Sequence, residues 1–191
     1  FHTLSNEFPN VPVHDLAIQT KSQALVIGTH GRSMFKADLM NIQKLLPETL
    51  MAELHIFEIQ KKKYSKNWGQ KQPYKEAKNP ELSVWFFTKT AGKVFWSVRH
   101  KDSKLLLNSG STDCSEGLNH WKYTLDVSEA VLEKYRKALL PIVDAKNVKK
   151  DSQKPMEIQK ADTGKHYLQK GVYTIGLEKG GKVVEQELVV E

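Results

Sequence analysis

The fold is decided first by two stretches near the start of the chain, NVPVHDLAI at residues 10–18 and ALVIGTHGRSMF at residues 24–35. Their alternation predicts two short strands joined by a polar turn, and the glycines at 28 and 31 mark a corner that leads into a third strand. This is most of one four-stranded blade, and a single blade cannot bury its own apolar faces. We therefore expect six apolar side chains to be covered by the following domain or by a second copy of the chain: Val13, Leu16, Ile18, Leu25, Ile27 and Phe35.

The same residues carry a family resemblance. The run NVPVHDLAIQ…ALVIGTHGRSMFKAD, within residues 8–40, is similar to the closing blade of the BNR/sortilin-like β-propeller proteins, which are often labelled glycosyl hydrolases. In that family a fibronectin-type or immunoglobulin-like sandwich follows the last blade, and GLNHWKYTL at 117–125 and KGVYTIGL at 170–177 resemble its strands. The resemblance implies the C-terminal part of a secreted, periplasmic or cell-envelope protein.

Composition is compatible with a folded chain of this kind. The 191 residues are 39% hydrophobic, which is enough for a core of about 100–120 residues. A single cysteine, Cys114, excludes an internal disulfide. No apolar run approaches the roughly 20 residues that a membrane-spanning helix needs. The chain opens at Phe1 without an initiator methionine, so we expect a processed or excised piece of a longer protein.

The net charge of +7 raises the question of nucleic acid. Most lysines are scattered, and the one run, Lys61–Lys63, is followed by Tyr64 and Trp68. Basic residues interleaved with aromatic ones bind single strands through phosphate contacts and stacking. A solvated lysine-rich linker has the same composition, and no nucleic-acid-binding motif accompanies the run. We favour the linker and expect no specific nucleic-acid partner.

Between the blade and the later strands the pattern changes. Asp38 is placed to cap a helix over residues 39–46 that Pro47 ends, although Pro47 equally opens a short turn through Leu50 and Met51. Residues 53–59 alternate as a strand does. Residues 60–80 are polar and contain two prolines, which makes them the best domain boundary in the chain.

From residue 81 the sequence is typical of an antiparallel sandwich, because short strands recur at intervals of about ten residues between turn signals. One helix, at 129–140, interrupts them, and a lysine-rich loop follows at 144–165. Gly180 and Gly181 form the turn of a terminal hairpin. The expected strands are 82–88, 93–99, 104–108, 118–125, 172–178 and 183–190, with a polar loop at 110–117.

These patterns predict a mainly β chain in three parts. Residues 1–40 hold residual propeller-blade strands, residues 41–80 form a helical and extended connector with a lysine-rich linker, and residues 81–191 form a fibronectin/Ig-like antiparallel β-sandwich with one inserted helix.

Catalytic and metal-binding patterns are missing from the sequence. The metalloprotease, serine-hydrolase and P-loop motifs are absent, and no two carboxylates share a framework that would oppose them across a glycosidic bond. Cys114 lies near Asp113 and His120, but a metal site needs more ligands at defined spacing. We therefore assign no catalytic residue, no metal and no cofactor.

Five residues remain as binding candidates. His30 and Arg32 lie in the glycine corner, where they either bond loop carbonyls or contact a substrate of the intact propeller. Among the aromatic residues, Trp85 with Phe87 and Trp96 with Trp121 are expected in the core. The other candidates are Phe86, Phe95 and Trp68, which we expect at exposed or interface positions. Phe86 and Phe95 are out of phase with the aromatic residues expected in the core, and Trp68 lies in the linker.

The function expected from the sequence is that of a non-catalytic accessory or interaction module of a larger propeller protein. Its expected partners are the rest of that propeller and a glycan or a protein, with self-association through the orphan blade as a further expectation. The alternative is a part of a glycoside hydrolase whose catalytic residues lie in the propeller blades outside this chain. A purely mechanical spacer is the third class, and it predicts no ligand.

Overall fold

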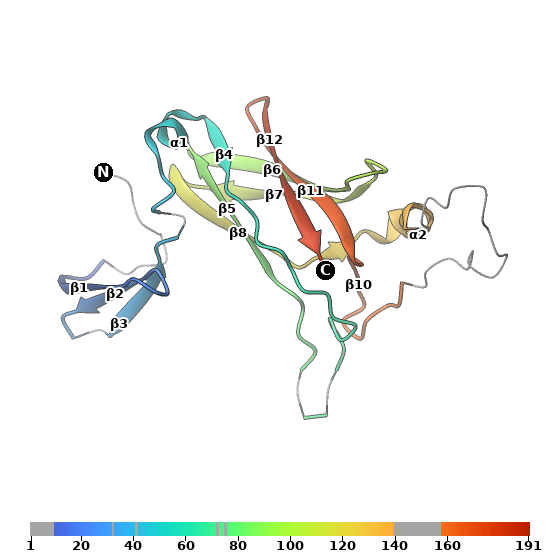
Figure 1. Ribbon diagram of the computed structural model, residues 1–191, viewed down its shortest axis with the longest axis horizontal. Helices are drawn as coiled ribbons and strands as arrows, with labels where there is room; N and C mark the ends of the chain where they lie inside the picture. Colours follow the sequence, from blue (N-terminus) through green and yellow to red (C-terminus); the bar gives the residue numbers. More distant parts are fainter. Residues whose placement is uncertain (1–9, 32, 41, 72, 75, 140–157) are drawn as a thin grey trace.

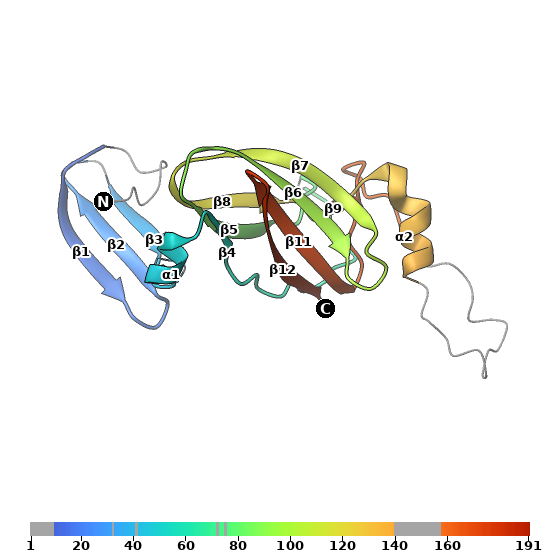
Figure 2. The same ribbon diagram turned by 90° about the horizontal axis from the view of Figure 1, so that it is seen from above.

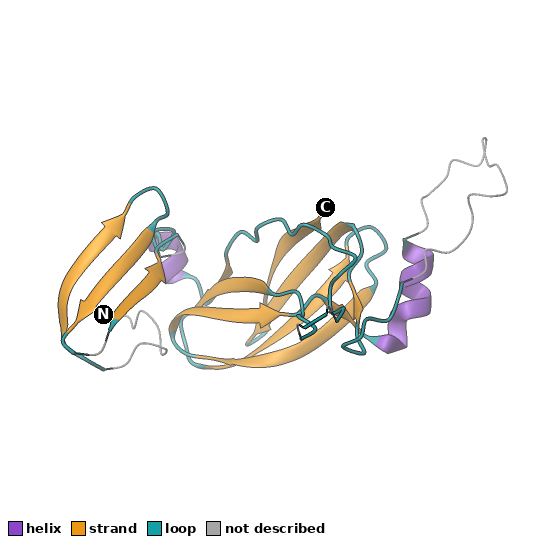
Figure 3. Ribbon diagram, turned by 90° about the horizontal axis from the view of Figure 1, so that it is seen from below, coloured by secondary structure: helices purple, strands orange, loops and turns teal. Residues whose placement is uncertain are grey.

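The computed structural model describes residues 10–31, 33–40, 42–71, 73–74, 76–139 and 158–191 (Figure 1). The described chain is mainly β, as predicted, and its strands pair in antiparallel sheets. A three-stranded sheet near the N-terminus lies to one side of the remaining strands, which pack together around one core (Figures 2 and 3).

The N-terminal sheet is an antiparallel meander of β1 (Val13–Gln19), β2 (Ala24–Thr29) and β3 (Met34–Asp38). Leu16 pairs with Ile27 and Ile27 with Phe35, so one apolar row crosses all three strands. Because side chains two apart share a face, the next row, Ile18 with Leu25 and Ala37, lies on the same side. The meander therefore has one continuous apolar face, which we call the blade face: Leu16, Ile18, Leu25, Ile27, Phe35 and Ala37.

The expectation that the following domain covers these side chains is wrong for β1, all of whose residues are exposed. Val13, Leu16 and Ile18 are 53%, 58% and 59% exposed. Ile27 on the middle strand is buried, and Leu25 and Phe35 are half-buried. The physical reason is that the meander packs beside the other sheets and not over them, so its first strand has no neighbour from the domain (Figure 2).

The predicted helix over residues 39–46 is also wrong. Asp38 is the last residue of β3, so it does not cap a helix, and the described residues that follow form turns. The helix that does form, α1, spans Pro47–Met51 with the proline in its first turn. Proline is well suited to that position, where its missing N–H and fixed φ cost nothing. The alternative in which Pro47 opens a short turn is therefore confirmed.

Two further sheets enclose the main core. One has the order β4 (Leu54–Ile56), β5 (Leu82–Thr88), β8 (Gly117–Tyr123). The other has the order β12 (Lys182–Val190), β11 (Gly171–Lys179), β6 (Gly92–His100), β7 (Leu106–Cys114). We call the described residues from 54 onward, which form these sheets and their connections, the two-sheet unit. Its buried cluster draws side chains from both sheets, including Val84, Phe86, Val98, Ile175 and Leu177.

The expected pairing of Trp96 with Trp121 is confirmed, whereas Trp85, also expected in the core, lies half-buried on the outer face of β5 against His120. Trp96 on β6 and Trp121 on β8 stack with ring centroids 4.5 Å apart, which joins the two sheets. Gly110 on β7 makes room for this pair, because a Cβ there would come within 2.6 Å of the Trp96 ring.

The polar loop expected at residues 110–117 is mostly strand, since β7 continues to Cys114. Its first residue, Gly110, lies under the Trp96 indole, a contact that strand propensities do not reveal.

The terminal hairpin is confirmed. β11 and β12 pair from Gly171 with Val190 to Lys179 with Lys182. Gly180 and Gly181 have φ of +56° and +79°, the left-handed values that a two-residue turn of this kind requires. β11 also pairs with β6, which places the hairpin inside the four-stranded sheet.

Residues 60–80 are not a free linker. The Lys62 N–H donates to Val189 O at 2.8 Å, and the Glu191 N–H donates back to Lys62 O at 3.0 Å. The Tyr64 N–H donates to Glu191 O at 2.7 Å. The segment therefore runs beside the open edge of β12 and partly covers it, which protects a sheet edge from pairing with other chains.

A closed ring of hydrogen bonds holds the inserted helix. After β9 (Asp126–Val127), a 3₁₀ turn (Glu129–Val131) leads into α2 (Leu132–Ala138), which brings Tyr135 into the core. The Gln169 N–H donates to Tyr135 Oη at 2.9 Å, the hydroxyls of Tyr135 and Tyr173 lie 2.5 Å apart, and Tyr173 donates to Gln169 O at 2.7 Å. Burial raises the pKa of Tyr135 to about 12, so its proton stays in the ring at neutral pH.

The substitution Tyr135→Phe removes one member of this ring and leaves the half-buried Gln169 N–H without its acceptor. We expect the free energy of unfolding in urea to fall by about 1–3 kcal/mol. Tyr74, which is fully exposed, supplies the control, and Tyr74→Phe should change it by less than about 0.5 kcal/mol. Equal changes in the two variants would contradict the role of the ring.

A second prediction concerns His166, in the short strand β10 (His166–Tyr167), which pairs with β9. The ring is buried, and Nδ1 has no hydrogen-bond partner among the described residues. Burial is the main reason that the pKa of His166 lies below its usual value, and the Lys160 ammonium lowers it further.

Because the folded pKa is the lower one, the unfolded chain takes up the proton first. Stability is then complete above the unfolded pKa of about 6.5 and falls as pH drops through the folded pKa. We expect the thermal midpoint to decrease between pH 7 and pH 5, and the decrease to be smaller in His166→Gln. The exposed His14→Gln is the control, and an unchanged slope in His166→Gln would refute the assignment.

Candidate functional site

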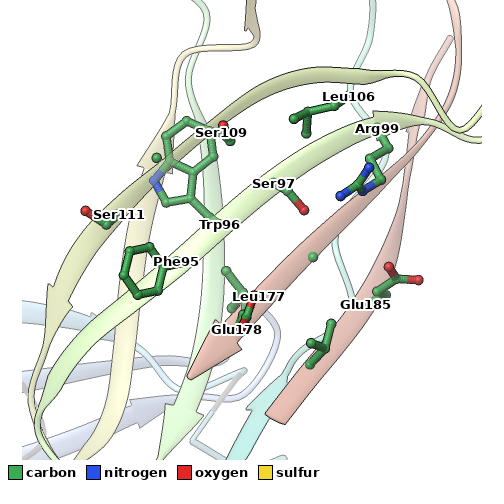
Figure 4. Close-up of a pocket in the computed structure, with 13 residues that line it drawn as sticks. Phe95, Trp96, Ser97, Arg99, Leu106, Ser109, Ser111, Leu177, Glu178 and Glu185 are labelled. Atoms are coloured by element: carbon green, nitrogen blue, oxygen red, sulfur yellow. The ribbon is translucent and has the colours of Figure 1, made fainter. Parts of the chain in front are cut away.

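The outer face of the four-stranded sheet carries a shallow trough (Figure 4). Strand register sorts the side chains of this face of the sheet into three rows that cross it. One row joins Val183, Glu178, Phe95 and Ser111; the middle row joins Glu185, Gly176, Ser97 and Ser109; the third contains Thr174, Arg99 and Leu106. The trough has a volume of about 570 Å³, within the range of small-molecule sites.

The middle row is the floor because its residues are small. Gly176 has no side chain, and a Cβ there would lie 3.0 Å from Ser97 Oγ, so even alanine would begin to fill the trough. Ser97 and Ser109 face each other across β6 and β7. Serine hydroxyls on this floor present one donor and two acceptor lone pairs each.

The walls combine an aromatic ring with a cation. Phe95 is 55% exposed at one end, and Arg99 follows four residues later on the same face of β6 (Figure 4). Within the described part of the chain, the Arg99 guanidinium has no ion-pair or hydrogen-bond partner. An exposed apolar ring and an unpaired fork of N–H donors are both available to a ligand.

Carboxylates complete the rim. Glu178 and Glu185 flank the floor and form no salt bridge with any described residue, whereas Glu187 in the next row pairs with Lys101. With Arg99 the lining therefore carries one positive and two negative charges. It offers donors and acceptors for hydroxyl groups and disfavours polyanions, because the two carboxylates repel them.

The predicted exposure is confirmed for Phe95 and wrong for Phe86. Phe86 is 1% exposed and lies in the core with Val84. The prediction assigned the face of Trp85 and Phe87 to the core, but the core face of β5 is that of Val84 and Phe86. Both faces are buried at this end of the strand, since Phe87 on the outer face is also only 2% exposed. Alternation cannot tell which face is solvated when both are covered.

The other three candidates lie elsewhere. His30 is exposed just after the end of β2. Its ring stacks on that of His14 with centroids 4.9 Å apart, and its backbone N–H donates to Pro12 O. Arg32 lies outside the described residues. Trp68 is half-buried between Tyr64 and Tyr167 and contributes to a separate cleft, not to the trough. The structure therefore does not bring the five candidates into one site.

Metal-binding clusters and the single cysteine were considered as possible reactive centres. No group of three or more histidine, cysteine, aspartate or glutamate side chains could hold a metal ion among the residues that the structure describes. Cys114 is buried, and its Sγ lies 3.2 Å from Gly92 O and 3.5 Å from Lys179 Nζ. The same Lys179 ammonium also donates to Thr88 Oγ1 and Thr90 O, so the thiol takes part in a partly buried polar network between neighbouring strands.

Comparisons of the chain with protein-family models, with curated proteins and with solved structures find no match. No helix in the described residues has the length and apolar character needed to cross a membrane.

Most trough residues were missed at the sequence level. Ser97, Ser109, Gly176 and Glu185 come from four strands and have no shared motif, so only strand register brings them into one row. The available signal was Phe95, an aromatic residue at a position whose neighbours in the strand point into the core.

Proposed function

We propose that this chain is a non-catalytic interaction module whose two-sheet unit binds a neutral oligosaccharide in the outer-face trough. The observation that carries the proposal is the combination of an exposed Phe95 ring with a floor of small hydroxyl-bearing residues and an unpaired Arg99. Sugars present an apolar face of C–H groups beside a rim of hydroxyls. Such a ligand packs on one ring and exchanges hydrogen bonds with guanidinium, carboxylate and serine groups.

The resemblance of the sequence supports the wider setting of this proposal. In this proposed setting, the two-sheet unit is a fibronectin/Ig-like sandwich at the C-terminal end of a secreted or cell-envelope propeller protein. Any glycoside hydrolysis then belongs to propeller blades outside this chain, and the chain holds the glycan without cleaving it. A purely mechanical spacer would not need an unobstructed trough with unpaired polar groups.

Binding is tested with Phe95→Ala and calorimetric titration of neutral oligosaccharides of glucose, mannose, galactose, xylose and N-acetylglucosamine. We expect at least one to bind the unchanged chain and Phe95→Ala to weaken that binding about tenfold, or about 1.4 kcal/mol. Arg99→Gln should weaken it as well.

The matched control is Tyr74→Ala, which removes a fully exposed aromatic ring that does not line the trough. The control should bind as the unchanged chain does. If none of these oligosaccharides binds, or if Phe95→Ala binds equally well, the trough is not a glycan site.

The blade face supports the second part of the expected function, in which the meander completes a propeller. Its exposed apolar side chains on β1 are the observation that favours this role, because an unpaired blade needs neighbouring blades to bury them. We propose the remaining blades of a longer form of this protein as the partner that covers them.

Hydrogen exchange on the 191-residue chain and on the full-length product of its gene tests that partner. Amides of residues 13–19 should exchange quickly in the chain alone and at least a hundredfold more slowly in the full-length protein. The chain alone should also sediment as a monomer. Equal exchange in both proteins would contradict the docking role, and protection through a dimer of the chain would assign the blade face to a second copy.

A further inference from the structure

A second cleft lies on the two-sheet unit, away from the trough. Its walls are the segment 64–70, which was expected to be linker, and the segment 159–170. Tyr64, Trp68 and Tyr167 supply three aromatic rings, and its volume is about 410 Å³. None of the residues that line the trough lines this cleft, so the two are separate sites.

The walls are fixed to each other by hydrogen bonds that leave the cleft open. The Tyr64 hydroxyl lies 3.0 Å from Gln169 Oε1 and donates to it, and the Tyr167 hydroxyl lies 2.6 Å from Asn79 Oδ1. Gly69 lies directly against two side chains, because a Cβ there would come within 2.5 Å of Thr163 Oγ1 and 2.6 Å of the Tyr167 ring. Gly69 has φ of +68°, a value that favours glycine, so this contact is built into the backbone. A cleft held in this way is preformed, which reduces the ordering cost of binding.

The charge of the cleft is of one sign. Lys66 and Lys170 belong to its lining, and no aspartate or glutamate does. Neither ammonium group forms a salt bridge or a hydrogen bond with any residue that the structure describes. The Asp162 carboxylate does not line the cleft and accepts the backbone N–H of Lys71 at 2.7 Å. Two unpaired ammonium groups without a lining carboxylate attract an anion.

The remaining lining groups indicate what kind of anion fits. The side-chain amides of Gln70 and Gln159 have no partner among the described residues, and each offers donors and an acceptor. The rings of Tyr64 and Tyr167 meet Trp68 at 70° and 75°, so these contacts provide no parallel pair of rings to sandwich a nucleobase. A single half-buried indole instead offers one apolar patch for one small ring.

We propose that this cleft, between the 64–70 and 159–170 segments, binds a small carboxylate attached to a six-membered ring. Lys66 and Lys170 hold the carboxylate, Trp68 packs against the ring, and the two glutamine amides bond its polar substituents. A cyclic sugar acid and an aromatic acid share this chemistry. The inference does not depend on glycan binding in the trough, since the lining residues and the sign of the charge differ.

Calorimetric titration with galacturonate and with 4-hydroxybenzoate tests the proposal, with galactose and AMP as comparison ligands. We expect one of the two carboxylates to bind at least tenfold more tightly than galactose, and the better one identifies the source of the ring. The double substitution Lys66→Gln with Lys170→Gln should reduce that binding at least tenfold, because both residues are surface lysines and the fold remains.

Lys63→Gln with Lys78→Gln is the control, since it removes the same charge from nearby lysines that do not line the cleft. It should leave binding within about twofold. Equal losses in the two double variants would show a general effect of charge and overturn the site, as would the absence of binding by both carboxylates. Tighter binding of AMP than of either carboxylate would replace the proposed ligand class. Phe95→Ala should leave carboxylate binding unchanged, which separates failure here from failure of the trough.

Discussion

The two-sheet unit depends on one junction of hydrogen bonds at Gln169. Its backbone closes the ring with the hydroxyls of Tyr135 and Tyr173, which fixes α2 against β11. Its side chain accepts from the Tyr64 hydroxyl and donates to Tyr167 O, which fixes the segment that follows β4. Three parts of the chain that are distant in sequence therefore meet at one residue. Because these polar groups are buried or half-buried, leaving any of them unpaired costs more than a surface hydrogen bond would.

Both proposed sites are built on this framework. The trough floor contains Gly176 of β11, the strand that carries Tyr173. The cleft is bounded by Tyr167 and Gln169 themselves. The sites differ in charge, since the trough has two unpaired glutamates and the cleft two unpaired lysines. If both proposals hold, this difference in charge separates a site for neutral ligands from a site for anions. The blade face is the third feature for which we propose a role, since an exposed apolar patch of this kind favours docking of a macromolecular partner.

The sequence predicted the parts of the fold that depend on local chemistry. Gly180 and Gly181 specify their own turn, and strand phase was enough to place Trp96 against Trp121. The sequence-based prediction failed where contacts between distant parts of the chain determine the structure. The role of Lys62 beside β12 depends on the C-terminal residues, and no local pattern in residues 60–80 shows it. Phe86 was assigned to the surface because alternation does not show that both faces of β5 are buried. The trough could not be predicted beyond Phe95, since its floor comes from strand register.

The central claim is that ligand binding, and not catalysis, is built on the outer face of the four-stranded sheet. Chemical-shift mapping of the ¹⁵N-labelled chain during titration with a neutral oligosaccharide that binds it tests this claim most directly. The account predicts that the largest shifts cluster on Phe95, Ser97, Arg99, Ser109 and Gly176, and that the oligosaccharide is recovered intact. Shifts centred on other residues, or cleavage of the oligosaccharide by the isolated chain, would contradict it.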